Sequence, residues 1–115
     1  MKRISFALTT NQVLTRTKTV TRRIGWATLK AGDRLQPIEK GMGLKKGEKQ
    51  KFLNGPIEIL SVRQEALALI TQSDVIAEGF PDWSPQDFID FLCKKHKVAP
   101  SQIVTRIEFK YLESA

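Results

Sequence analysis

The sequence is short of the residues that mark secreted, membrane-spanning or metal-dependent proteins. Its 115 residues include one cysteine, Cys93, and one histidine, His96. A single cysteine cannot form a disulfide within the chain, which favours a reducing compartment, and no His or Cys residues stand at zinc-ligand spacing. There is neither an apolar run near the roughly 18 residues that cross a bilayer nor a basic-then-apolar leader. We therefore expect a cytoplasmic protein with no metal, no other cofactor and no membrane partner.

Length and composition indicate one globular domain. The sequence is 41% hydrophobic and 27% charged, which is typical neither of a disordered tail nor of a membrane protein. A chain of this length buries about two-thirds of the surface that it exposes when unfolded. We therefore expect a single domain over residues 1–115.

Positive charge is concentrated in the first half of the chain. Residues 1–55 carry 13 Lys and Arg against 3 Asp and Glu, whereas residues 56–115 carry 6 against 9, for a net charge of +7. Such an asymmetry suits a phosphate-bearing ligand, and nucleic acid is the commonest partner of this kind. The alternative is a basic protein without such a ligand.

The run over residues 18–23 is the most informative segment. It brings together the cations Lys18, Arg22 and Arg23 and the hydroxyls of Thr19 and Thr21. Fixed cations beside hydroxyl groups favour the binding of an anion or an acyl group. A solvated edge strand is the alternative, because β-branched residues favour extended backbone and charges discourage edge pairing.

Apolar spacing predicts strands and short helices in mixed order. Alternation and apolar runs predict strands over residues 3–8, 34–39, 56–62 and 102–112. Capping residues and helical spacing predict short helices over residues 9–16, 71–79 and 84–95. This order is too irregular for a doubly wound sheet, so we expect an α+β fold with a small curved sheet or barrel.

Two further features are typical of nucleic-acid binding, each with an alternative. Residues 40–55 are rich in glycine and lysine and predict a flexible basic loop, in which Lys45, Lys46 and Lys49 could contact a phosphate backbone or simply be solvated. The loop lacks the Gly-Lys-Ser/Thr pattern of nucleotide-binding loops. Trp26 follows the basic run and could stack on a base, or be a rim or core tryptophan.

Four segments together resemble the ASCH domain, a PUA-like β-barrel family associated with RNA. They span nearly the whole chain in the family's order: Lys18-Thr19-Val20-Thr21-Arg22-Arg23, Gly32-Asp33-Arg34-Leu35, Ala77-Glu78-Gly79-Phe80 and Ile107-Glu108-Phe109. The resemblance implies a small curved β-barrel flanked by about three short helices. The chain departs from the family at Arg16, where many relatives have glycine, and in its longer basic insertion.

One branch of this family consists of small amidohydrolases that remove the acetyl group from acetylated cytidine. The resemblance to that branch implies Lys18 as proton acceptor, Thr21 as nucleophile and Glu78 as proton donor, with Arg23 at the position of the motif arginine. Other relatives resemble RNA-binding modules or ribonucleases. The ligand is therefore either a modified nucleoside or RNA, and a non-catalytic RNA-binding module remains the alternative.

The implied chemistry places conditions on the structure. A threonine hydroxyl needs an adjacent base, and keeping a lysine neutral at pH 7 takes roughly 4 to 5 kcal/mol of environmental bias. Burial and the neighbouring arginines could supply it. Lys18 and Thr21 would point to opposite faces of a regular strand, so a shared site requires a bend between them. Glu78 could instead be an exposed residue in the last turn of its helix.

Overall fold

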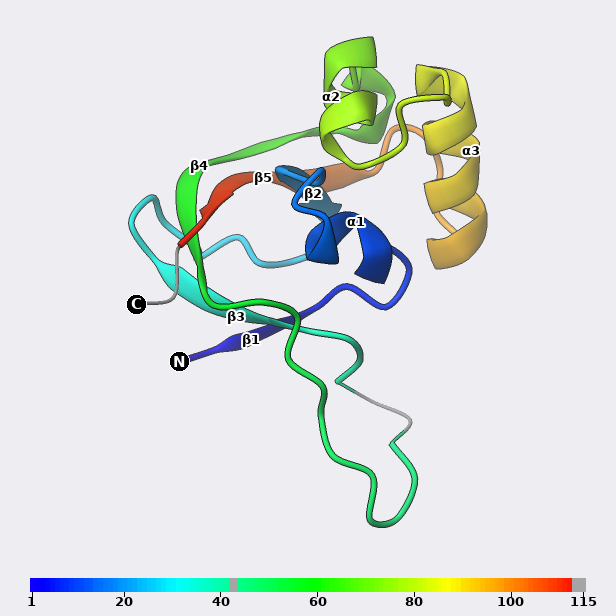
Figure 1. Cartoon of the computed structure of the whole chain (residues 1–115). Helices are drawn as coiled ribbons and strands as arrows, with labels where there is room; N and C mark the ends of the chain where they lie inside the picture. The colour runs from blue at the N-terminus through cyan, green and yellow to red at the C-terminus, as the bar shows by residue number, and fades with distance from the viewer. Residues whose placement is uncertain (42–43, 113–115) are drawn as a thin grey trace.

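The computed structural model describes residues 1–41 and 44–112 of the chain. Its five strands form one mixed sheet in the order β1-β3-β4-β5-β2 (Figure 1). The strands are β1 (Arg3–Ser5), β2 (Val20–Arg23), β3 (Arg34–Ile38), β4 (Ile57–Ala66) and β5 (Ile103–Tyr111). Only β1 and β3 pair in parallel; the other neighbours are antiparallel.

Three helices accompany the sheet, which confirms the expected α+β class. They are α1 (Thr10–Leu14), α2 (Gln72–Ala77) and α3 (Pro85–His96), and a 3-10 turn (Leu67–Leu69) precedes α2. Side chains cap α2 and α3. Of the two capping candidates for α2 in the sequence, Thr71 and Ser73, Thr71 accepts from the amide of Asp74. Ser84, the expected cap of α3, forms a capping box with Asp87. The first residue of α3 is Pro85. Proline has no backbone N–H, but an N–H at this position would have no partner within the helix.

The sheet is open, which corrects the expectation of a closed barrel. Within residues 1–41 and 44–112, no ladder of hydrogen bonds joins the edge strands β1 and β2. Both are short, with three and four residues, and each pairs with one neighbour alone, β1 with β3 and β2 with β5. A side chain spans the gap instead: an Nη2–H of Arg23 donates to the backbone oxygen of Ser5.

Two apolar clusters hold the domain together. The first lies within the sheet and against α1, and is formed by Ile4, Phe6, Val13, Leu35, Leu53, Ile57, Ile59, Ile107 and Phe109. The second joins α2 and α3 to the start of β5, and is formed by Leu67, Ile70, Val75, Phe88, Ile89, Leu92 and Val104. Figure 1 shows α2 and α3 side by side at one end of the sheet, near β2. The helices therefore cover the sheet end at which the basic run lies.

The basic loop projects from the other side of the molecule (Figure 1). Of the expected span 40–55, residues 42 and 43 lie outside the described residues. We call residues 44–51 the lysine loop; the side chains of Lys45, Lys46 and Lys49 are exposed in it. The buried side chain of Leu53 anchors the returning chain to the core. None of the helices among the described residues is long and apolar enough to span a membrane.

Candidate active site

The segment before β2 bends so that Lys18 and Thr21 reach the same site. The amide of Lys18 donates to the oxygen of Gln12 in α1, and the amide of Thr19 donates to the oxygen of Ala77 in α2. The hydroxyl of Tyr111 donates to the backbone oxygen of Lys18 at 2.6 Å. The backbone at Lys18 is thus fixed between two helices and β5, and regular strand alternation begins only after it.

Glu78 enters the site because Gly79 ends α2. Gly79 has φ of +103°, which L side chains rarely adopt. A Cβ there would lie 2.6 Å from Cγ and 2.9 Å from Cβ of Gln12, so only glycine lets the end of α2 approach α1 this closely. Glu78 immediately precedes this turn and is 2% exposed. The glycine of the Glu-Gly-Phe segment is therefore required by packing, because it lets the end of α2 approach α1 and places the carboxylate of Glu78 in the interior.

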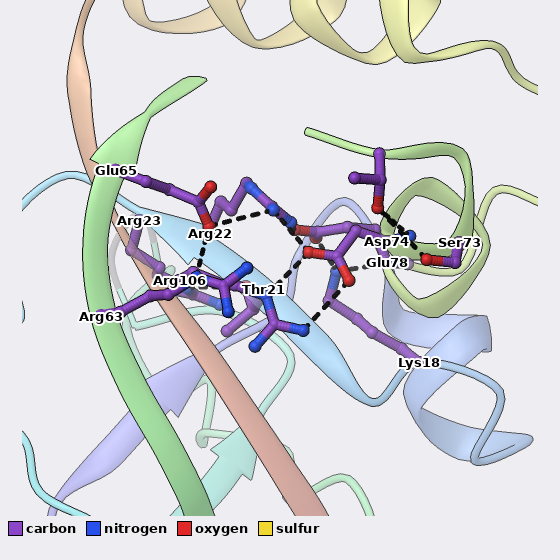
Figure 2. Close-up of polar contacts among 11 residues, drawn as sticks. Lys18, Thr21, Arg22, Arg23, Arg63, Glu65, Ser73, Asp74, Glu78 and Arg106 are labelled. Carbon is purple, nitrogen blue, oxygen red and sulfur yellow. Dashed lines mark hydrogen bonds and ion pairs between the residues drawn. The ribbon is translucent and has the colours of Figure 1, made fainter. Parts of the chain in front are cut away.

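Lys18 and Glu78 form a buried pair (Figure 2). Lys18 Nζ lies 2.8 Å from Glu78 Oε1 and 2.8 Å from its backbone oxygen, and Lys18 is 3% exposed. Burial lowers the pKa of Lys18 below its ordinary value; the carboxylate of Glu78 opposes this shift, and the charges of Arg23 and Arg22 add to it. The expected mechanism needs a pKa shift in this direction.

A line of alternating charges continues from Glu78 through Arg22 and Asp74 to Arg106 (Figure 2). Arg22 Nη1 lies 3.3 Å from Glu78 Oε2, and Arg22 Nη2 lies 2.5 Å from Asp74 Oδ2. Arg106 Nε donates to the same Asp74 oxygen at 2.7 Å. We call Glu78, Arg22, Asp74 and Arg106 the charge row. Arg22 and Arg106 face each other across β2 and β5, so Asp74 separates two cations that would otherwise repel.

Asp74 and Arg106 stabilise each other's ionised forms. Hydrogen bonds from Arg106 and Arg22 lower the pKa of Asp74 to about 2, against the opposing effect of burial. The hydrogen bond from Asp74 raises the pKa of Arg106 above its ordinary value. Glu65 joins from the side, with Oε1 3.4 Å from Arg22 Nη2. The row is thus a rigid polar support behind the Lys18–Glu78 pair.

Arg23 fixes the Thr21 hydroxyl. Its Nε–H donates to Thr21 Oγ1 at 3.3 Å, and its guanidinium carbon lies 4.8 Å from the centre of the Phe6 ring. Burial lowers the pKa of Arg23 to about 10, although Glu78 acts in the opposite direction. Thr21 is 4% exposed. Because the cation uses one lone pair of the hydroxyl oxygen, the O–H hydrogen stays available to a base.

The three residues of the expected catalytic set line one cavity of about 540 Å³. Lys18, Thr21 and Glu78 all line it. Arg22, Arg23 and Trp26 line it as well, together with the aromatic side chains of Phe6, Phe80, Phe88 and Phe91. The cavity therefore has mostly apolar walls and a small group of polar side chains, as ligand pockets generally do.

Not every candidate from the sequence lies at this cavity. Thr19 is exposed outside it, and Lys45, Lys46 and Lys49 are on the lysine loop, also outside its lining. Their roles in ligand binding stay predictions. The residues that the structure describes contain no group of three or more potential His, Cys, Asp or Glu metal ligands.

Sequence reasoning missed several residues of the site. Asp74 and Arg106 form half of the charge row, and Lys95 and His96 line the cavity from α3. The capping threonine of α2 predicts where Asp74 lies along the helix, but not that it faces two arginines. Lys95 and His96 do stand at helical spacing from Phe88, Phe91 and Leu92, which is a signal for a shared face.

Comparison with solved structures identifies the fold. The chain is similar to protein EF3133 from Enterococcus faecalis, a DUF984 protein, with a TM-score of 0.65 and 14% identity over 96% of this chain and 79% of that one. It is also similar to an ASCH domain from Lactobacillus crispatus, with a TM-score of 0.57 and 15% identity over 90% and 69%. No protein-family model and no curated protein matches the sequence.

The chain therefore has an ASCH-like, PUA-like fold. This confirms the ASCH-like fold that the four sequence segments implied, although the sheet is open and not the expected barrel. At identities of 14% and 15%, the likeness concerns the fold alone, and an activity must be argued from the cavity itself.

Proposed function

We propose that the cavity is the active site of an amidohydrolase that removes the acetyl group from the exocyclic nitrogen of acetylated cytidine. The observation that carries the proposal is the convergence of Lys18, Thr21 and Glu78 on one cavity of about 540 Å³. This volume lies within the usual range for small-molecule sites, and Trp26 and Phe80 offer faces for a pyrimidine ring. The substrate class follows from the sequence resemblance.

The hydrogen bonds of Lys18 suit a neutral amine. A neutral amine has two N–H groups and one lone pair, and Lys18 Nζ has two acceptors at 2.8 Å, the backbone oxygen and Oε1 of Glu78. The charge row also balances without Lys18, because it holds two arginines and two carboxylates, Arg22 and Arg106 against Asp74 and Glu78. The lone pair is then free to accept a proton from Thr21.

The proposed reaction uses the roles that the family resemblance implies for these residues. Thr21 Oγ attacks the acetyl carbonyl carbon, and its proton passes to Lys18 Nζ. Glu78 relays this proton to the exocyclic nitrogen, so the carbon–nitrogen bond breaks and cytidine leaves. Water then attacks the acetyl ester on Thr21 and gives a proton to Lys18, which returns it to Thr21 Oγ as acetate departs. Arg23, on the threonine oxygen, stabilises negative charge as it develops there.

Replacing Lys18 by arginine tests the proposal. Lys18→Arg replaces the neutral amine by a guanidinium that stays protonated and cannot accept the threonine proton, so we expect kcat for deacetylation to fall at least about 100-fold. The assay follows cytidine and acetate released from acetylated cytidine. Lys30→Arg is the matched control, because Lys30 is exposed and does not line the cavity.

A second variant separates chemistry from folding. Thr21→Val removes the hydroxyl while keeping the side-chain shape, and should abolish turnover without a large change in Tm. Thr28→Val, at an exposed position outside the cavity, is its control. Undiminished turnover in a folded Lys18→Arg or Thr21→Val protein would exclude this mechanism.

A second candidate function is RNA binding by the lysine loop. Its support is the exposure of Lys45, Lys46 and Lys49 in the basic half of the chain. If they contact phosphates, replacing all three by alanine should weaken RNA binding and lower the slope of log affinity against log salt by about 2 to 3. Affinity and slope equal to those of the unaltered protein would count against this function.

A further inference from the structure

One face of α3 forms a continuous wall of the cavity. Phe88, Phe91, Leu92, Lys95 and His96 all line it, at the spacing that places residues on one side of a helix. From the first to the last of these residues the helix rises about 12 Å. The wall is apolar at its first part and carries two basic side chains in its last turn.

The basic end of this wall lies at an open end of the cavity, whose lining is also exposed at Leu8 and Ile24. Phe88 is 1% exposed, whereas Lys95 and His96 are exposed. Among the described residues, Glu78 is the one carboxylate in the cavity lining, and it already binds Lys18 and Arg22. No ion pair involves Lys95 in the described part of the chain. The open end therefore presents cations without a carboxylate partner in the lining.

We propose that the ligand of this cavity carries a phosphate on its ribose, and that Lys95 and His96 bind this phosphate at the open end. The nucleoside part rests on the proposed function; the phosphate part rests on α3. An uncharged nucleoside leaves both side chains without a partner, whereas a phosphate accepts hydrogen bonds from an ammonium and an imidazole N–H.

The side chains, and not the helix end, provide the attraction. The C-terminal end of a helix carries a partial negative charge, which repels a phosphate. Removing Lys95 and His96 should therefore remove the preference for a phosphate completely. The apolar part of the wall should continue to bind the base and the ribose.

Binding of cytidine and its phosphates tests the inference without depending on turnover. Calorimetric titration compares cytidine with cytidine 5′-monophosphate and cytidine 3′-monophosphate, which contain no bond for the enzyme to cleave. At low salt we expect at least one monophosphate to bind about five- to tenfold more tightly than cytidine, since contacts between exposed charges are individually modest. This ratio should shrink as salt screens the charges.

Two variants locate the effect on α3. In the double variant Lys95→Ala/His96→Ala, the ratio of the two affinities should fall to about 1, with cytidine binding unchanged. Lys94→Ala is the matched control: this lysine is exposed on the same helix turn but lies outside the cavity lining, so the ratio should persist. Equal affinities in the unaltered protein, or a preference that survives in the double variant, would overturn the inference.

The same titration separates this inference from the proposed function. If cytidine binds and neither monophosphate binds better, the phosphate site is wrong and the nucleoside cavity stands. If no ligand of the series binds, both are wrong. A cytidine-containing trinucleotide distinguishes the two sources of the phosphate: tighter binding than the monophosphates indicates an RNA chain, and equal binding indicates a free nucleotide.

Discussion

The two basic segments of the first half of the chain have opposite environments. In the run 18–23, Lys18 and Arg22 are 3% and 5% exposed and lie against carboxylates. In the lysine loop, Lys45, Lys46 and Lys49 are exposed on the surface. In the sequence both segments look like phosphate-binding patches. The comparison shows that a count of cations does not reveal which of them are free to bind a ligand.

The difference arises from which residues the fold brings to each segment. The carboxylates that surround the basic run belong to the acidic half: Glu65 on β4, Asp74 in α2 and Glu78 at the end of α2. Among the described residues, no carboxylate of that half forms an ion pair with the lysine loop, and the loop's own Glu48 pairs with Lys40. The charge asymmetry along the sequence is thus partly cancelled in space, mainly beside the cavity, and by one exposed pair between Arg34 and Glu58.

Removing a charge from each region should give the largest contrast. Asp74→Asn leaves Arg22 and Arg106 buried with one negative charge fewer, so we expect the free energy of unfolding to fall by about 3 to 5 kcal/mol. Glu48→Gln breaks the exposed pair with Lys40 and should change the free energy of unfolding by less than about 0.5 kcal/mol. Urea denaturation of both variants measures these values.

The relative size of the two losses decides this test. Similar small losses in both variants would mean that the charge row is hydrated and contributes as little as a surface pair. An unchanged m-value is the control, because it shows that the unfolded state has not been altered by either substitution.

A smaller contrast is expected between two glycines that both have positive φ. Gly79→Ala places a Cβ 2.6 Å from Gln12 Cγ, whereas Gly47→Ala in the lysine loop meets nothing within 4 Å. Backbone strain should destabilise both by about 1 kcal/mol, and overpacking should add about 1 to 3 kcal/mol at Gly79 alone. Thermal unfolding, followed by circular dichroism, measures the difference.

The two glycine variants should also differ in deacetylation activity. Moving the end of α2 displaces Glu78 from Lys18, so Gly79→Ala should also reduce deacetylation, and Gly47→Ala should not. Equal stability of the two variants would show that Gln12 yields easily and that Gly79 does not set the position of Glu78.

Local signals in the sequence predicted much of the fold. The Ser-Pro start of α3 and the threonine cap of α2 fixed the helix starts, because capping depends on neighbouring residues alone. Alternation predicted β3 and β5 with nearly their observed bounds. The set Lys18, Thr21 and Glu78 came from the family resemblance and not from a local signal, and all three line one cavity.

Features that depend on distant partners were not predictable. The sequence left open whether the basic run binds an anion or is a solvated edge strand; β2 is an edge strand, but its residues are largely buried. Alternation along β5 puts Arg106 on its polar face, which would be exposed if α2 did not bring Asp74 over it. The open sheet likewise depends on which strands lie side by side, and no local signal specifies this.

The smallest contrast concerns acid, because it acts through one carboxylate of the charge row. The pKa of Asp74 is lowered to about 2 by its arginine partners, against about 3.9 in an unfolded chain. The unfolded state therefore binds more protons between these values, and the free energy of unfolding should decrease as pH falls from about 4 to about 2. Above pH 4 this contribution is fully present. We expect a loss of about 1 to 2 kcal/mol, below the full value of the shift because solvent screens part of it.

Direct observation of the carboxyl group avoids the summed effect of other acids. The side-chain carbon resonance of Asp74 should titrate near pH 2 in the folded protein. A midpoint near 4 would mean that Arg22 and Arg106 do not lower the pKa of this carboxyl group. The run 18–23 would then differ from the lysine loop in its burial alone, and not in ion pairing that affects pKa values. A midpoint near 2, by contrast, would show that Asp74 is ionised beside Arg22, whose other Nη atom contacts Glu78. Arg22 could then balance the charge of Glu78, so that Lys18 need not be charged.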